Sequence, residues 1–87
     1  MERPNLYVLA RLLEALARAP APVRKTQLQL MAGLNYTVFA KYLEFLIGRE
    51  MVEVAPDPGG EVLRLTPKGY DIYCFLADGI ARILTGK

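Results

Sequence analysis

The sequence predicts an α+β fold that is mostly helical, with three helices, a two-stranded hairpin and a closing helix. Apolar residues recur at spacings of three and four in the helical segments, as expected of helices that bury one face. Two short segments of partly alternating polarity flank the turn sequence PDPGG at 56–60, which is typical of a β-hairpin. With 87 residues the chain has room for one domain, which we expect to span 1–87.

The first helix is predicted at 5–19. Asn5 can cap its start, because an asparagine side chain accepts hydrogen bonds from the free N–H groups of a first helical turn. Pro20 and Pro22 end it, because proline cannot continue the hydrogen-bond ladder. We expect a brief extended segment at 23–25. The leucines of the apolar stripe are Leu6, Leu9, Leu12, Leu13 and Leu16.

A second, short helix is predicted at 26–33. Thr26 precedes Gln29 by three residues, the spacing of a capping box, so we expect threonine to cap this helix. Gly33 can adopt the left-handed conformation that ends it, and Leu34 is expected to be buried in the turn. The apolar side is predicted to consist of Leu28, Met31 and Ala32.

A longer third helix is predicted at 35–49, with Asn35 as its cap. Helix, brief turn and helix form the layout of a helix-turn-helix, which can place its second helix in the DNA major groove. The core-facing stripe is expected to contain Phe39, Tyr42, Leu43, Leu46 and Ile47. The residues expected to point mostly outward are Thr37, Val38, Lys41 and Glu44.

The hairpin is predicted at 51–65 and the last helix at 67–84. Thr66 is placed to cap that helix, and Pro67 occupies the first helical position, where its missing N–H costs nothing. Apolar residues cover more than one face of this helix, which indicates burial on more than one side. In so small a domain we expect the second side to meet another chain.

This order of elements resembles that of a winged helix-turn-helix domain, whose hairpin is called the wing. The residues that carry the resemblance are AGLNYTVFAKYLEFLIGREMVEV at 32–54, the hairpin, and RLTPKGYDIY at 64–73. Over about 22–75 the chain is similar to small archaeal winged-helix DNA-binding proteins, and more distantly to regulators of the multiple-antibiotic-resistance type. One departure is Glu50, where many such domains have glycine. Gly48 lies two residues earlier, so the alternatives are that the helix ends sooner or that it ends in a different geometry. A glutamate in the left-handed conformation would carry strain, and the exit angle of the wing is therefore left open.

The resemblance implies binding to double-stranded DNA, by a transcriptional regulator or a small chromatin-associated protein. Together with the helix phase, it implies that the major groove is faced by Asn35, Tyr36, Thr37, Val38 and Lys41. For Asn35 the alternative is that it only caps its helix. The phosphates flanking the groove would be contacted by Arg24, Lys25, Arg49 and Arg64. Acidic residues near Arg64 predict that the wing itself contacts DNA weakly or not at all.

Charge is distributed unevenly along the chain. Residues 1–49 carry seven basic and three acidic side chains, whereas residues 50–87 carry four basic and six acidic ones. The positive field therefore lies on the half with the expected helix-turn-helix, as a phosphate-binding surface requires. The alternative is ordinary solvated charge on helix faces.

The apolar surplus of the first and last helices predicts a homodimer. A hydrophobic fraction of 53% is high for a solvated monomer of this size. A two-fold dimer would also place two recognition helices for half-sites about one DNA turn apart. The expected interface comprises Leu9, Tyr73, Phe75, Leu76, Ile80, Ile83 and Leu84.

Enzymatic activity is not expected. The chain has no histidine, which excludes a His-based triad, and it has no phosphate-cradling glycine motif. Cys74 is the single cysteine and lies in an apolar run, where we expect inert packing. We therefore expect no metal, cofactor or small-molecule ligand. The rival function is a winged-helix module that binds another protein of the transcription machinery without contacting DNA.

No apolar run approaches the length of a membrane span, and the N-terminal residues do not resemble a signal peptide. These features, with a single cysteine, favour a cytoplasmic location.

Overall fold

The computed structural model describes residues 4–85. It confirms the predicted fold class, a mostly helical α+β fold with one two-stranded antiparallel sheet. In chain order the elements are α1 (Leu6–Arg18), α2 (Lys25–Ala32), α3 (Tyr36–Gly48), β1 (Val52–Asp57), β2 (Gly60–Leu65) and α4 (Pro67–Thr85).

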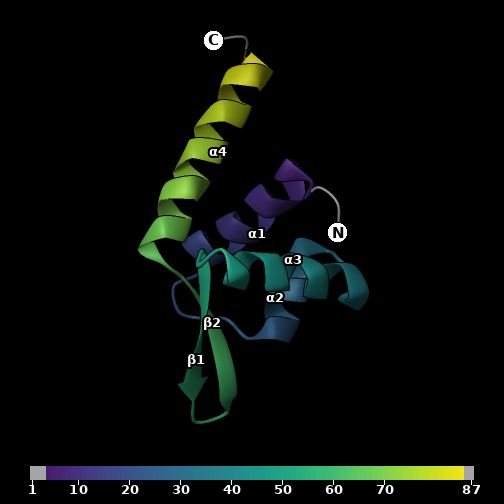
Figure 1. Cartoon of the computed structure of the whole chain (residues 1–87), viewed down its shortest axis with the longest axis vertical. Helices are drawn as coiled ribbons and strands as arrows, with labels where there is room; N and C mark the ends of the chain where they lie inside the picture. The colour runs from purple at the N-terminus through teal and green to yellow at the C-terminus, as the bar shows by residue number, and fades with distance from the viewer. Residues whose placement is uncertain (1–3, 86–87) are drawn as a thin grey trace.

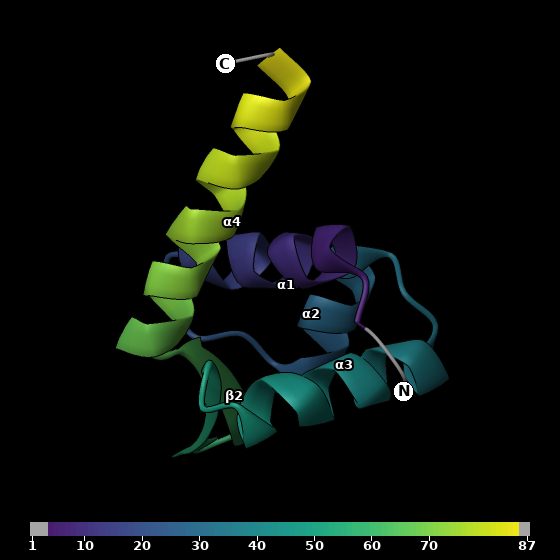
Figure 2. The ribbon, with the colours of Figure 1, turned by 45° about the horizontal axis from the view of Figure 1, so that its top comes forward.

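Helices α1, α2 and α3 form a central body from which the hairpin and α4 project in opposite directions (Figure 1). Figure 2 shows α2 between α1 and α3, with α4 crossing the end of α1 and rising away from the body. The molecule is therefore elongated, measuring 46 × 26 × 21 Å. Within residues 4–85, no helix combines the length and apolar character needed to cross a membrane.

The core lies where the three helices meet the base of the hairpin. Its fully buried side chains come from all three helices of the body and both strands: Leu12, Leu13, Leu28, Phe39, Leu46, Val52 and Leu63. Three residues predicted to be on core-facing stripes are instead exposed, namely Leu6 (57%), Met31 (51%) and Ile47 (37%). Each lies at the margin of its helix's buried face, where no other element covers it.

Two asparagines cap their helices as predicted. The Asn5 side-chain oxygen accepts hydrogen bonds from the N–H groups of Tyr7 (2.8 Å) and Val8 (3.3 Å). The Asn35 side-chain oxygen accepts from the N–H of Val38 at 2.9 Å. The Asn5 N–H also donates to the Tyr42 hydroxyl at 2.8 Å, which ties the start of α1 to α3.

The predicted cap of α2 is wrong. The helix begins at Lys25, so Thr26 lies inside its first turn and Arg24 occupies the cap position. The side chain of Gln27 reaches back and accepts a hydrogen bond from the Arg24 N–H at 3.3 Å. Gln29 instead spans the turn after the helix, where its amide donates to the Leu34 carbonyl at 3.3 Å. Gly33 is left-handed there (φ 67°), as predicted, and Leu34 is half-buried.

The hairpin occupies 52–65, within one residue of the predicted 51–65, but its turn is tighter than predicted. The strands pair from Val52 with Leu65 to Asp57 with Gly60, so only two residues of the predicted five-residue turn connect them. Val23 adds an antiparallel bridge to β2, exchanging hydrogen bonds with Leu63 at 3.2 and 2.7 Å. The predicted extended segment is thus confined to the residues before Lys25, which already belongs to α2.

Thr66 joins the two ends of the hairpin to α4. Its hydroxyl donates to the Glu50 carbonyl at 2.6 Å and accepts from the Gly69 N–H at 2.9 Å, so it caps α4 as predicted. Its own N–H donates to the Met51 carbonyl at 3.1 Å. Glu50 is left-handed (φ 61°), the strained conformation expected where other domains have glycine. This set of hydrogen bonds sets the direction in which the hairpin leaves the body.

Candidate nucleic-acid interface

The helix-turn-helix consists of α2, the turn 33–35 and α3. Phe39 and Leu46 anchor the inner face of α3 in the core, each at most 2% exposed. The opposite face carries a stripe with spacings of four, three and four residues, and all of its members are exposed: Thr37, Lys41, Glu44 and Gly48. In the described chain no other element covers this stripe, so α3 is free to enter a groove.

The five residues predicted to face bases do not lie on one line. Thr37 and Lys41 occupy the centre of the exposed stripe. Tyr36 (71% exposed) and Val38 (36% exposed) lie on its two flanks. The side-chain oxygen of Asn35 is engaged in capping α3, which agrees with the alternative that this residue only caps its helix.

Two of the four predicted phosphate ligands are engaged by carboxylates of the hairpin. The Arg24 guanidinium lies 2.6 Å from the Asp57 carboxylate, and both side chains are about 40% exposed (41% and 38%). Arg64 pairs across the strands with Glu53, its direct partner in the register, at 3.4 Å. A phosphate would have to compete with these carboxylates for both arginines.

The other two predicted phosphate ligands border α3. Lys25, at the start of α2, lines a hollow beside α3 together with Tyr36 and Ile47. The Arg49 guanidinium stacks over the Phe45 ring, 5.0 Å from its centroid, on the other flank. Lys25, Lys41 and Arg49 have no ion-pair partner among residues 4–85, so these three cations are available to an anionic ligand.

Glu44 is the residue of this surface that the sequence interpretation did not include in the site. It lines both hollows that flank α3, one with Lys25 and the other with Lys41 and Arg49. The helical spacing in the sequence already predicted that Glu44 points outward from its helix. Its place between three basic side chains depends on the position of α2 and on the end of α3.

Comparison with known proteins decides the family. Residues 2–79 match the family described as winged helix-turn-helix. The chain belongs to this family. The predicted resemblance is therefore confirmed, and the hairpin is the wing. No curated protein matches the chain closely enough in sequence to count as a relative.

Solved structures share the winged-helix fold over nearly the whole chain. F93 from STIV, a winged-helix DNA-binding protein, is 20% identical with a TM-score of 0.83, covering 93% of this chain and 95% of F93. Sso10a-2, a DNA-binding protein from Sulfolobus solfataricus, is 20% identical with a TM-score of 0.79, covering 95% of this chain and 84% of that one.

The PcaV transcriptional regulator from Streptomyces coelicolor, solved in complex with its natural ligand, is 26% identical with a TM-score of 0.80. The alignment covers 93% of this winged-helix chain but only 58% of PcaV. The chain thus spans less than two thirds of the length of that regulator. The predicted likeness to archaeal winged-helix proteins and to the antibiotic-resistance-type regulators is confirmed at the level of the fold.

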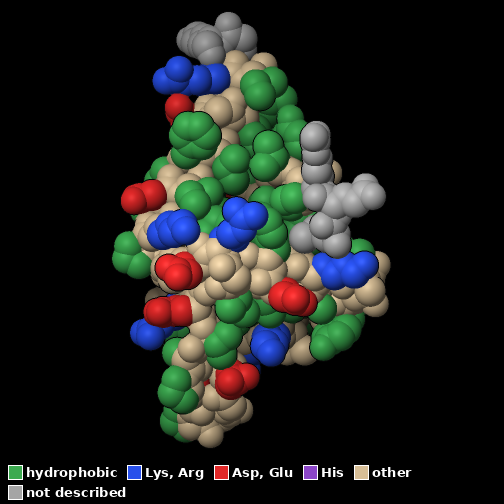
Figure 3. Space-filling model, viewed as in Figure 1, with side chains coloured by type: hydrophobic (Ala, Val, Ile, Leu, Met, Phe, Trp, Pro, Cys, Tyr) green, Lys and Arg blue, Asp and Glu red, His purple; other side chains and the backbone are tan. Residues whose placement is uncertain are grey.

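The second surface of interest in this winged-helix protein is α4. Ile72, Tyr73 and Leu76 are half-buried and pack against the core, whereas the far side of the helix is uncovered. Green apolar side chains gather over this helix in Figure 3, while basic and acidic side chains intermingle over the body. The most exposed apolar residues of the helix are Phe75 (79%), Leu84 (74%) and Ile83 (72%).

Two expectations for the surface around α4 are wrong. Leu9 was predicted in a dimer interface but is 5% exposed, because α1 turns it into the chain's own core. Cys74 was predicted to be packed but is exposed, because the α4 face that carries it points away from α1. The nearby Cys74 thiol raises the pKa of the Tyr70 hydroxyl above its usual range.

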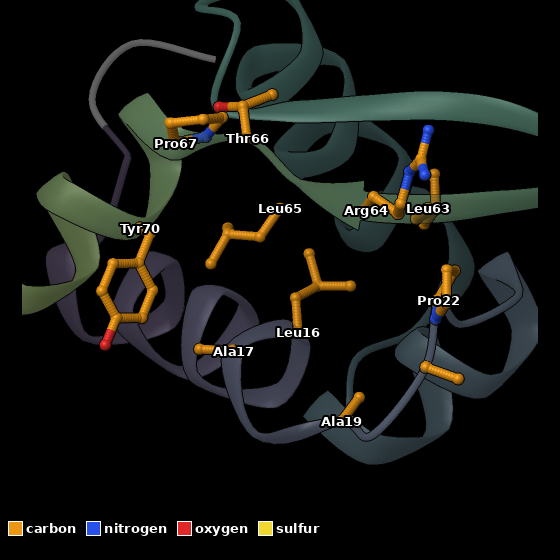
Figure 4. Close-up of a pocket in the computed structure, with 11 residues that line it drawn as sticks. Leu16, Ala17, Ala19, Pro22, Leu63, Arg64, Leu65, Thr66, Pro67 and Tyr70 are labelled. Carbon is orange, nitrogen blue, oxygen red and sulfur yellow. The ribbon is translucent and has the colours of Figure 1, made fainter.

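A hollow of about 480 Å³ lies where α4 leaves the body (Figure 4). Its walls are mainly apolar and come from the end of α1, the strand β2 and the first turn of α4. Of its polar side chains, Arg64 faces Glu53, and Thr66 is occupied at the root of the wing. The hollow therefore lies between α4 and the body, and its polar side chains do not point towards a common site (Figure 4).

Proposed function

We propose that this winged-helix chain binds double-stranded DNA as a homodimer, with α3 in the major groove, and acts as a transcriptional regulator or small chromatin-associated protein. The observation that carries the proposal is the uncovered outer stripe of α3, which is held rigidly by the core on its other side. DNA-binding proteins with the same fold, F93 and Sso10a-2, support it. The family is typically non-enzymatic, and we propose no catalytic role.

Different parts of α3 would read different groups in the groove. Thr37 and Lys41, at the centre of the stripe, would reach base edges, where a hydroxyl can donate or accept and an ammonium donates to guanine. Val38 on one flank would meet a thymine methyl, and Tyr36 on the other would face the groove wall. Asn35 would contribute through its amide N–H₂, because its oxygen already caps the helix.

The phosphate contacts would come from Lys25 and Arg49 on the two flanks of α3, joined by Arg24 and Arg64. Lys25 and Arg49 can engage phosphates directly, whereas the two paired arginines must first leave their carboxylates. Arg24 and Arg64 would therefore contribute less to affinity than their charge implies, in line with a weak contact of the wing.

The dimer would form through α4. Its exposed apolar residues extend beyond the body, so a second copy can cover them without approaching α3 (Figure 2). The expected contacts are Tyr73, Phe75, Leu76, Ile80, Ile83 and Leu84. Covering the most exposed of these side chains would contribute about 1.5–3 kcal/mol each, whereas the half-buried Tyr73 and Leu76 would contribute less.

Fluorescence anisotropy with labelled genomic fragments tests DNA binding. With Lys25 and Arg49 fully engaged and the two paired arginines engaged only in part, a dimer makes about six phosphate contacts, so affinity should fall by roughly 10³-fold between about 50 and 200 mM salt. Thr37→Ala with Lys41→Ala should weaken binding, while Glu14→Ala on the distant α1 should not. An absence of binding at the lowest salt contradicts the proposal.

A second candidate function is a protein-binding module that does not contact DNA. It is favoured by apolar side chains that are exposed on the helix-turn-helix, namely Leu30 (80%), Met31 (51%) and Tyr36 (71%). Exposed apolar surface of this kind marks an interface with a protein as readily as a groove-binding surface. Salt separates the two functions, because an apolar interface keeps its affinity where DNA binding is lost.

A further inference from the structure

We infer that Glu44 selects a base with an exposed amino group, cytosine foremost, at the centre of the DNA site. The inference rests on the proposed DNA binding and goes beyond it by assigning specificity to one carboxylate. It concerns a residue that otherwise counts against DNA binding, because an acidic side chain on a recognition helix repels phosphates.

The position of Glu44 places it over base edges and not over the DNA backbone. It lies on the outermost stripe of α3, three residues after Lys41 and four before Gly48. Among the residues that line the two hollows flanking α3, Glu44 is the acidic one, and it lines both hollows. When a helix lies in the major groove, its outermost stripe faces the floor and its flanks face the phosphates.

The charges around Glu44 agree with this position. Lys25 borders one hollow, and Lys41 and Arg49 border the other, so positive charge lies on both flanks of a central carboxylate. Glu44 has no ion pair among the described residues, although Lys41 is a near neighbour on the same face. Its oxygens are therefore free to accept hydrogen bonds from a ligand.

The chemistry of the groove floor determines which base a carboxylate accepts. An ionised carboxylate only accepts hydrogen bonds, and the major groove offers donors at the N4 amino group of cytosine and the N6 amino group of adenine. Guanine and thymine present oxygen acceptors, which repel a carboxylate. Adenine also presents N7, an acceptor beside its amino group, so cytosine is the better partner. Selection thus combines attraction to one base with repulsion of others.

Selection from a random DNA pool, run in parallel with wild type, Glu44→Gln, Glu44→Ala and Glu61→Gln, tests the inference. Glu61 is an exposed wing acid, so Glu61→Gln removes the same charge away from α3. Wild type and Glu61→Gln should enrich the same motif with a cytosine at one position of each half-site. Glu44→Ala should lose that preference by about tenfold, and Glu44→Gln should shift it towards adenine.

The outcomes separate failure of the inference from failure of the proposed function. If wild type enriches a motif and Glu44→Ala enriches the same motif with higher affinity, Glu44 only repels DNA and the inference is wrong while DNA binding stands. If wild type binds no DNA, both are wrong. Because Glu44 is exposed, both of its variants should melt near the wild-type temperature, which circular dichroism checks.

Discussion

At the scale of single residues, the root of the wing is where local conformation and packing are most constrained. Glu50 holds a left-handed backbone without being glycine, and Gly69 leaves no room for a side chain. Both lie next to Thr66, whose hydroxyl connects them through two hydrogen bonds. The direction of the wing therefore depends on three residues at the root of the wing, one of which, Glu50, directly follows the proposed phosphate ligand Arg49.

Glu50→Gly should stabilise the protein. We expect the free energy of unfolding to rise by about 0.5–1 kcal/mol, because relief of the left-handed strain exceeds the entropy cost of glycine. Glu14→Gly, inside α1, is the matched control and should destabilise by about 0.5–1 kcal/mol. Urea denaturation at equal protein concentration measures both, and a loss of stability in Glu50→Gly would refute the assignment of strain.

Gly69→Ala should destabilise the protein by about 1–3 kcal/mol, because an added Cβ would collide with the Met51 carbonyl oxygen. Gly79→Ala, in the same helix, meets nothing within 4 Å and should be neutral or stabilise by up to about 1 kcal/mol. Thermal unfolding of the two variants compares them directly. Equal melting temperatures would show that the start of α4 can move away from the wing root.

At the scale of elements, an ion pair connects the wing to the start of α2. Asp57 at the tip of the wing holds the Arg24 guanidinium at 2.6 Å and also accepts the Gly59 N–H at 3.3 Å. The wing contacts the helix-turn-helix mainly near the core. The ion pair adds a second contact, between the tip of the wing and the start of α2. The same contact occupies Arg24, one of the four predicted phosphate ligands.

Asp57→Asn should strengthen DNA binding more than Glu61→Gln does. Both changes remove one negative charge from the wing, but only Asp57→Asn also releases Arg24, while its amide oxygen can still accept from Gly59. We expect the slope of log affinity against log salt to steepen by about one per protomer in Asp57→Asn alone. Identical slopes in anisotropy titrations would mean that Arg24 does not contact phosphate.

At the scale of the whole molecule, the elongated shape separates the exposed face of α3 from the far end of α4. The body and wing present α3, and α4 extends from the opposite side with its apolar residues uncovered (Figure 1). The proposed DNA contact and the proposed dimer contact therefore lie on different parts of the molecule.

Phe75→Glu with Ile83→Glu should convert a dimer into a monomer that remains folded, because both side chains are largely exposed in the protomer (79% and 72%). Light scattering should give about twice 9.7 kDa for wild type and 9.7 kDa for the variant. Leu30→Glu, on the exposed face of α2, is the control and should stay dimeric. A wild-type monomer at high micromolar concentration would exclude the dimer.

The sequence by itself determined the order of the elements. It also determined the helix ends that are capped by residues close in sequence. Asn5, Gly33, Asn35 and Thr66 make their capping contacts within four residues of their own positions, so these capping roles follow from local chemistry. The departure from glycine at Glu50 is visible in the sequence, but its left-handed conformation was only one of the geometries that the sequence left open for the end of α3.

Only the tertiary structure decided the contacts between segments distant in sequence. Arg24 pairs with Asp57, 33 residues away, and this is why a predicted phosphate ligand is partly occupied. Leu9 shares the periodicity of its stripe, but only the packing of α1 shows that it belongs to the core and not to an interface. Glu44 acquires its place among three cations from α2 and the end of α3. Periodicity identifies the face of a helix, whereas the partner of that face depends on how the elements pack.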